Sequence, residues 1–324
     1  MKNDSTSRHK VISYAKYGYF FILPFFLTYA FFMIYPLIYT FILSLQGNGK
    51  KLGEFVGFDN YRALLFGGSD SLGLHQEAFW SSMGRTLILW AGNFVVQIIL
   101  SLLLAVWFSD SRIKVKGAGF FKVAMYMPNI ITAASVASMM VMLFAGQKDN
   151  AINSMLLNLG IIGEPFDFIS DEWASRIIVM FVQSWMWYGN TMLLLMSGIF
   201  GIDTSIYEAA SIDGSSGMHT FINITMPILK PIFIYVFITS MIGGLQMFDI
   251  PYLFHTGADY KPHLETAAVY IFRNFRGSGN ILGRNHGLAA AASMILFVIT
   301  VALGIFIFKF NSESTGIKKR KKKG

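Results

Sequence analysis

Six apolar runs divide this sequence, and their length constrains the fold more than any other feature. They cover residues 18–45, 86–108, 120–144, 174–201, 228–252 and 287–310. A helix needs about 20 apolar residues to cross the hydrocarbon core of a bilayer, and each run reaches that length. We therefore expect an all-α polytopic membrane protein whose six transmembrane helices form one domain, residues 18–310.

Composition excludes several other classes of protein. Hydrophobic residues make up 54% of the chain and charged residues 14%, which is far from the average of soluble domains. There is no cysteine, so disulfides, thiol nucleophiles and cysteine-ligated metals are excluded, and the six histidines lack metal-ligand spacing. No G-x-x-x-x-G-K-S/T sequence occurs, so we expect no ATP binding, no catalytic residue, no metal and no cofactor in this chain.

The distribution of positive charge predicts the orientation. The segment 1–17 is basic, and the first apolar run is too long for a signal peptide and lacks a cleavage site, so we expect a retained helix. Six spans place both termini on one side, and the cytoplasmic assignment puts about 16 Lys and Arg inside and about 10 outside. The tail, residues 311–324, carries much of the net charge of +8, which argues against nucleic acid as a partner. It either fixes the topology, which we favour, or binds anionic lipid headgroups.

The segments between the runs are more polar. We expect loops at residues 46–85, 109–117, 146–173 and 256–284. Within the runs, Asn93 and Gln97 are four residues apart and share one helix face, which indicates a face turned toward the bundle or a cavity. Pro128 lies inside the third run.

The stretch 207–231 is the one long mixed segment between two apolar runs. It begins with Glu208, Ala209 and Ala210, which favour a helix. Gly214 predicts the end of that helix, because glycine takes a positive φ without steric cost. A second, short amphipathic helix is indicated by the spacing of Met218, Phe221, Ile222 and Thr225, and Pro227 and Pro231 mark its end and the start of the next run. We expect a helix–turn–helix packed on a membrane surface or on a partner.

This stretch resembles the EAA loop of the inner-membrane permease subunits of ATP-binding-cassette (ABC) importers. The family pattern is Glu-Ala-Ala, three residues, Gly, nine residues, Ile, one residue and Leu-Pro. The positions in register are Glu208, Ala209, Ala210, Gly214, Ile224 and Pro227, and Met226 replaces the Leu. The resemblance implies that residues 203–231, here named the EAA segment, dock into a cleft on a cytoplasmic ATPase subunit; the alternative is an ordinary amphipathic loop. The coupling residues that it implies are Glu208, Ala209, Ala210, Asp213, Gly214, Met218, Phe221 and Pro227.

Two other stretches resemble carbohydrate permeases. Gly57, Asn60 and Tyr61 form a G-x-x-N-Y element, for which the alternative is a plain turn followed by a short interfacial helix. The F-D-x-x-Y-x-L-T-x-G-G-P stretch is matched loosely by Phe248, Asp249, Tyr252, Leu253, Thr256 and Gly257, with Ala258-Asp259 in place of Gly-Pro, and the similarity continues at Thr266, Tyr270, Gly287, Ala289 and Ala290. The chain thus resembles a MalF-like permease subunit of the carbohydrate uptake type 1 importers, with a type I ABC importer permease fold.

The resemblance implies a function and a set of partners. The chain would be the permease subunit of an ATP-driven importer of sugars or oligosaccharides in a bacterial plasma membrane. It would pair with a second, homologous permease subunit and with two copies of a cytoplasmic ATP-binding subunit. An extracellular sugar-binding lipoprotein or periplasmic protein would deliver the substrate.

Four residues in the spans are candidates for a sugar pathway: Trp187, Asn190, Gln246 and Asp249. Aromatic faces stack on the apolar faces of sugar rings, and amides and carboxylates bind the hydroxyl groups. Polar groups within spans are costly unless they have partners or a function. The alternatives are helix packing or an interfacial belt for the tryptophan, and a place at the outer interface for Asp249.

Two other functions remain open at this stage. One is a secondary transporter or channel that works without an ATPase, although ion coupling usually needs carboxylates within spans and only Asp249 qualifies. The other is a membrane scaffold that recruits a cytoplasmic partner through the EAA segment. Co-purification of an ATPase whose hydrolysis is stimulated by sugar would distinguish the importer from both.

Overall fold

The computed structural model describes residues 15–47, 53–67, 70–110, 115–254, 260–277 and 284–314. Within these ranges all regular secondary structure is helical, and there is no β-strand, only one isolated bridge between Gln46 and Phe55. The prediction of an all-α fold is therefore confirmed. The long helices are α1 (Ala15–Tyr29), α2 (Tyr35–Ser44), α4 (Asp70–Ser109), α8 (Glu172–Phe200), α11 (Met226–Leu245) and α14 (His286–Ser314). The shorter ones are α3 (Asp59–Phe66), α5 (Ala118–Tyr126), α6 (Ala133–Phe144), α7 (Ala151–Asn158), α9 (Thr204–Ile212), α10 (Gly217–Thr220), α12 (Asp249–Leu253) and α13 (Ala267–Arg276).

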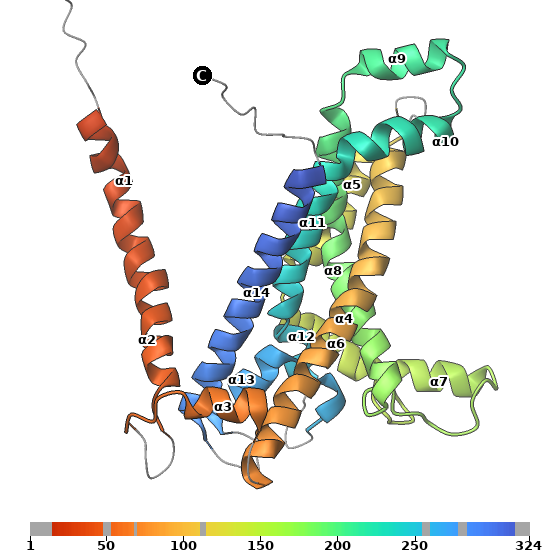
Figure 1. The fold of residues 1–324 in the computed structure, drawn as a ribbon. Coiled ribbons are helices and arrows are strands. Elements are labelled where there is room, and N and C mark those ends of the chain that lie inside the picture. The colour runs from red at the N-terminus through yellow and green to blue at the C-terminus, as the bar shows by residue number, and fades with distance from the viewer. Residues whose placement is uncertain are drawn as a thin grey trace, which may run out of the picture.

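All six predicted spans have a helical counterpart. Four described helical runs are long and apolar enough to cross a membrane: Tyr17–Ser44, Leu74–Ser109, Gly217–Leu253 and His286–Lys309. Two bent helix pairs bring the number to as many as six, namely Ala118–Ile130 with Ala133–Phe144 and Glu172–Phe200 with Thr204–Ile212. Figure 1 shows α9 and α10 at one end of the bundle and α3, α7 and α13 at the other. Helix α1 begins, and α14 ends, on the side of α9 and α10 (Figure 1), as an even number of crossings requires.

The first span stands apart from the other helices (Figure 1). Its two α-helices are joined by a π-helical turn, Ala30–Ile34, and Pro36 lies in the first turn of α2 directly after it. A π turn displaces the regular hydrogen-bond ladder, so the missing N–H of a proline is tolerated there. None of the residues in the most apolar window of this run is buried, and α2 touches the rest of the chain mainly through α14.

The third span is broken, whereas the sequence predicted one continuous run at residues 120–144. Helix α5 passes into a 3₁₀ turn, Met127–Ile130, and α6 then leaves at 88° to it. Pro128 accounts for the break, because proline lacks an amide N–H and cannot continue the α-helical ladder. Thr132 restarts the helix in extended conformation, and its side chain accepts a hydrogen bond from the Ser135 amide at 3.3 Å.

The predicted loops contain more helix than expected. Helix α4 begins at Asp70, inside the predicted loop 46–85, and α7 and α13 lie within the other two long loops. The G-x-x-N-Y element forms a turn followed by the short helix α3. The Asn60 amide donates to the carbonyl oxygens of Ser44 and Gln46, both at 2.9 Å, and the Tyr61 and Ser44 hydroxyls lie 2.6 Å apart. These bonds attach α3 to the end of α2.

Helices α4 and α8 pack along each other and form the most extensive helix–helix contact of the described chain. Helix α8 starts at Asp171, whose carboxylate accepts from the Trp173 and Ala174 amides at 3.1 and 2.8 Å. Gly189 in α8 allows the backbone at Met125 to approach closely, since a Cβ there would overlap the Met125 carbonyl oxygen. This contact holds the broken third span against α8.

Candidate functional site

The EAA segment forms a helix, a glycine turn and a second helix at one end of the bundle (Figure 1). Asp203 caps α9 by accepting a hydrogen bond from the Ser205 amide at 2.9 Å, and this bond lowers the pKa of the Asp203 carboxyl. Gly214 has φ +74°, the left-handed conformation expected from the sequence. The Ser215 amide then bonds back to the Ala210 carbonyl at 2.9 Å, which closes the end of α9.

The second helix is not a separate element, and this part of the sequence prediction is wrong. Helix α10 continues through a π-helical turn, Phe221–Thr225, directly into α11. Pro227 lies in the first turn of α11, where a proline is compatible with a helix, so it does not end the preceding helix. The described chain from Gly217 to Leu245 is therefore one helical run that joins the EAA segment to the bundle.

The predicted coupling residues divide into exposed and buried groups. Glu208, Ala209, Asp213, Gly214, Met218 and Pro227 are exposed, whereas Ala210 is buried and Phe221 is half-buried. Met218 has 69% of its surface exposed, and Ile212 has 86% exposed. Ile212 is not among the predicted coupling residues, although a large β-branched residue two positions before a turn glycine is a visible signal. The exposed apolar surface thus lies at Ile212, Met218 and Ile222, and Phe221 points away from it.

A cavity of about 420 Å³ separates the EAA segment from the ends of α4 and α8. Glu208, Ser211 and Phe221 contribute to its lining, together with Ser109 and Asp110 of the α4 end. One hydrogen bond crosses from α9 to the π turn, between the Tyr207 and Thr225 hydroxyls at 3.1 Å. The helix–turn–helix is consequently held away from the bundle and is attached to it mainly through its two ends.

The four predicted pathway residues line one cavity of about 480 Å³ in the middle of the bundle. Trp187 and Asn190 are three residues apart on α8 and face the same side. Gln246 and Asp249 come from the short break between α11 and α12. The structure therefore brings these four side chains together, and it places Asp249 on the cavity wall. The cavity has further polar lining, here named with the four as the polar cavity: Asn93, Gln97, Gln183, Thr191, Tyr235, Thr239 and Ser240.

Local sequence explains the shape of the polar cavity. Helix α11 ends at Leu245, and Gln246 and Phe248 leave the helical conformation, which turns the chain before α12. Gly244 lets α11 approach α4, because a Cβ there would overlap the Trp90 indole. The Trp90 indole N–H donates to the Ser240 hydroxyl at 3.2 Å across this contact.

Several lining residues were not selected from the sequence as pathway candidates. Asn93 and Gln97 were noted only for sharing a face, and Gln97 donates to the Thr191 hydroxyl at 2.7 Å. Gln183 precedes Trp187 by one helical turn, and this spacing was a usable signal. Tyr235 and Thr239 on α11 gave no signal, because single hydroxyl residues occur in any apolar helix.

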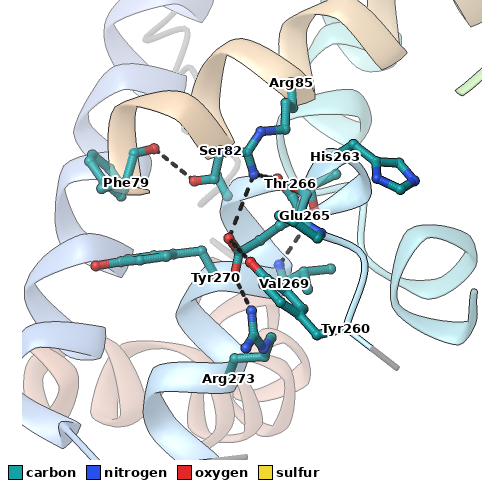
Figure 2. Close-up of polar contacts among 12 residues, drawn as sticks. Phe79, Ser82, Arg85, Tyr260, His263, Glu265, Thr266, Val269, Tyr270 and Arg273 are labelled. Atoms are coloured by element: carbon teal, nitrogen blue, oxygen red, sulfur yellow. Dashed lines mark hydrogen bonds and ion pairs between the residues drawn. The ribbon is translucent and has the colours of Figure 1, made fainter. Parts of the chain in front are cut away.

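A buried ionic cluster (Figure 2) involves α13, which lies at the end of the bundle opposite the EAA segment (Figure 1). Glu265 pairs with Arg273 at 2.7 Å and with Arg85 at 3.6 Å, and it accepts a hydrogen bond from the Tyr260 hydroxyl at 2.6 Å. The Arg273 guanidinium also stacks on the Tyr260 ring, 3.5 Å from its centroid. Burial and the neighbouring carboxylate raise the pKa of Tyr260 far above its usual value. We name Arg85, Tyr260, Glu265 and Arg273 the Glu265 cluster.

This cluster fixes one wall of the polar cavity. Thr266 follows Glu265 in the chain and donates to the Met247 carbonyl at 2.6 Å, within the break between α11 and α12. The next amide, Ala267 N–H, donates to the Thr86 hydroxyl of α4 at 2.8 Å. Figure 2 shows Arg85 of α4 and Arg273 of α13 meeting at Glu265, which lies in the 260–266 segment. Two of the predicted pathway residues, Gln246 and Asp249, therefore lie beside backbone that these hydrogen bonds hold in place.

Two groups of predictions fall outside this geometry. Thr256, Gly257 and Ala258-Asp259 of the carbohydrate-permease stretch lie outside the described residues, as do most of the N-terminal segment and the basic tail from residue 315. Among the residues that the structure does describe, there is no group of three or more His, Asp or Glu side chains placed to hold a metal ion.

Comparison with known proteins agrees with this architecture. Residues 97–312 match the family model described as "Binding-protein-dependent transport system inner membrane component". The chain is 28% identical to the arabinooligosaccharides transport system permease protein AraP of Bacillus subtilis, over 92% of this chain and 89% of AraP. It is 27% identical to the lactose transport system permease protein LacF of Rhizobium radiobacter, over 90% and 91% of the two chains.

Solved structures show the fold. A chain of a bacterial ABC transporter involved in the import of the acidic polysaccharide alginate superposes with a TM-score of 0.75, at 21% identity and over 94% of this chain and 96% of that one. A chain of a bacterial alginate ABC transporter in complex with an alginate pentasaccharide-bound periplasmic protein gives 0.77, at 19% identity over 93% and 96%. The predicted ABC importer permease fold is confirmed.

Proposed function

Because this chain belongs to the family of binding-protein-dependent transport system inner membrane components, we propose that it is the permease subunit of an ATP-driven importer of sugars or oligosaccharides. Relatives that match about nine tenths of the chain are named as permeases for arabinooligosaccharides and lactose. ATP hydrolysis then occurs on partner subunits. The observation that carries the proposal is the helical run Gly217–Leu245, which leads from the EAA segment to the break at the polar cavity.

This run supports coupling between a cytoplasmic ATPase and the transport pathway. Its first residues bear the exposed Met218, and its end at Leu245 leads directly to Gln246 and, across the break, to Asp249 at the polar cavity. A helix is stiff along its axis, so movement imposed on α9 and α10 is transmitted to the cavity wall. The exposed apolar side chains Ile212, Met218 and Ile222 would fill a cleft on the ATPase, and Gly214 would set the angle between the two helices.

The polar cavity is the proposed sugar pathway. Trp187 offers an aromatic face for a sugar ring, and Asn190 and Gln246 offer amides for its hydroxyl groups. All three side chains are exposed in the isolated subunit although they lie at the level of the spans. Polar groups are not left facing hydrocarbon, so this face must meet water or a second subunit.

The open face supports pairing with a second, homologous permease subunit, with the pathway between the two. The first span, which has an exposed apolar surface along its whole length, offers further area for that partner and for lipid. Two ATP-binding subunits would dock on the two EAA segments. A sugar-loaded binding protein would dock on the opposite end, as the complex of the alginate transporter with its periplasmic protein suggests.

The proposal places the EAA segment, and with it both chain termini, in the cytoplasm of a bacterial cell. This orientation agrees with the excess of Lys and Arg expected on that side. It also places the Glu265 cluster on the outer side, where the binding protein arrives.

Uptake of labelled sugars tests the proposal directly. Cells with and without this subunit are given radiolabelled arabinooligosaccharides, lactose and maltose, and the purified complex is assayed for sugar-stimulated ATP hydrolysis. We expect uptake of at least one sugar that disappears on deletion and that requires ATP. Uptake that persists without ATP would indicate a secondary transporter or channel, and an associated partner without any uptake would indicate a scaffold.

A further inference from the structure

The polar cavity contains one charged group, and that group is negative. Its lining combines amides, hydroxyls, aromatic rings and aliphatic side chains with the Asp249 carboxylate. No Lys, Arg or His belongs to the lining, all of which lies within the described residues. Sites that bind a carboxylate or phosphate group commonly supply an Arg or Lys side chain, and this lining has none.

The nearby cations are engaged elsewhere. Arg85 and Arg273 pair with Glu265. Arg176, at the start of α8, pairs with Glu172 at 2.7 Å, and Lys261 donates to the Ser170 hydroxyl at 2.8 Å. These bonds hold the positive charges in the layer of the Glu265 cluster, away from Trp187 and Asn190.

The Asp249 carboxylate is available to the cavity. Its side chain is exposed on the cavity wall, and within the described chain it makes no hydrogen bond and no ion pair. A free carboxylate accepts hydrogen bonds from sugar hydroxyls, which are donors. The same carboxylate repels a second anion, and a low-dielectric surrounding increases that repulsion.

We propose that the polar cavity selects uncharged sugars over sugars that carry a carboxylate, sulfonate or phosphate group, and that Asp249 is the residue that rejects the anions. This inference rests on the proposed function, because it assigns the substrate class of the same site.

Sugar binding by the complete importer, assayed without its binding protein, tests the proposal. The importer in nanodiscs is titrated with lactose, maltose and trehalose, and with the counterpart of each in which one primary hydroxyl is oxidised to a carboxylate. Saturation-transfer NMR reports the weak binding expected of a transport site. We expect each neutral sugar to bind on the order of tenfold more tightly than its acid, the effect of one nearby like charge.

Variants assign the discrimination to Asp249. The Asp249→Asn variant should bring the neutral and acidic affinities to within about threefold of each other, because the repelling charge is gone. The matched control is Asp149→Asn, which removes an exposed carboxylate between α6 and α7 and should leave the ratio unchanged.

Three outcomes would overturn the inference. The first is an acid that binds wild type as tightly as its neutral counterpart, and the second is a ratio that Asp249→Asn does not alter. The third is that the importer takes up neutral sugar but binds no sugar in this assay. That result would leave the proposed function intact. Absence of any ATP-dependent sugar uptake would instead overturn the proposed function together with this inference.

Discussion

The two ends of the bundle are built in opposite ways. The EAA end is held by bonds that span at most 18 residues of sequence: Asp203 with Ser205, Ser215 with Ala210, and Tyr207 with Thr225. Apolar side chains at this end are exposed. At the other end, Glu265 bonds to Arg85 across 180 residues of sequence, and both partners are largely buried.

This difference indicates which end has its interaction partners within the subunit and which end needs a second protein. Buried charges are stable only when paired, so the Glu265 cluster must form inside the folded subunit. Exposed apolar side chains on a helical hairpin above a cavity gain stability only when a partner covers them. Changes at the Glu265 cluster should therefore affect folding, and changes at the EAA end should affect coupling.

The largest expected effect is that of Glu265→Gln on stability. Loss of this carboxylate leaves Arg273 and Arg85 buried without a counter-charge, which costs about 3–5 kcal/mol. Thermal unfolding of the detergent-solubilised subunit measures the loss. The matched control is Glu172→Gln: its carboxylate pairs with Arg176 but is 56% exposed, so the cost should stay below about 1 kcal/mol. Equal losses in the two variants would show that the Glu265 cluster is no more stabilising than a surface pair.

Gly214→Val should act on coupling with a smaller effect on folding. A β-branched residue at φ +74° is strained by about 1–3 kcal/mol, and no neighbouring atom lies close enough to add a clash. We expect α9 to change its angle, with sugar uptake per ATP hydrolysed falling several-fold while the subunit still inserts. Gly119→Val introduces the same side chain into open space at an ordinary φ, and it should leave that ratio unchanged. Normal uptake by the Gly214 variant would contradict the coupling role.

Met218→Ser should separate docking from stability. Met218 is 69% exposed, so the free energy of unfolding should change by no more than about 0.5 kcal/mol. The loss of an apolar docking group should nevertheless reduce sugar-stimulated ATP hydrolysis. The matched control is Met155→Ser on α7, at the other end of the bundle. Met155 has 56% of its surface exposed, and its replacement should leave ATP hydrolysis intact. Indistinguishable behaviour of the two variants would remove Met218 from the docking surface.

The smallest effect concerns pH and the Glu265 end. Burial, and then the nearby Arg176 charge, lower the pKa of His263. The unfolded chain therefore binds a proton more readily than the folded one, so stability is full above the unfolded pKa of about 6.5 and decreases as the pH falls below it. Unfolding followed between pH 7.5 and 5 should show this decrease, and His263→Gln should reduce its slope. If stability fell more steeply with pH in the variant than in wild type, the pKa of His263 would not be lowered by folding.

Much of the fold was predictable because its causes are local. Hydropathy placed the six spans, and the G-x-x-N-Y element appeared as a turn and a short helix. The break of the third span at Pro128 was not predicted, since proline within an apolar run is compatible with a kinked or a broken helix. Phe221, one of the predicted coupling residues, lines the cavity beneath α9 and α10, a position that the spacing of apolar residues did not indicate.

The sequence alone determined where the chain crosses the membrane and where α9 must end, since run length and the φ tolerance of Gly214 depend on neighbouring residues only. It also identified Trp187, Asn190, Gln246 and Asp249 as unusual, because polar groups in spans are conspicuous. Only the tertiary structure placed those four around one cavity and paired Glu265 with Arg85 and Arg273. Such pairings join residues far apart in the chain, and their energy depends on burial that no local pattern records.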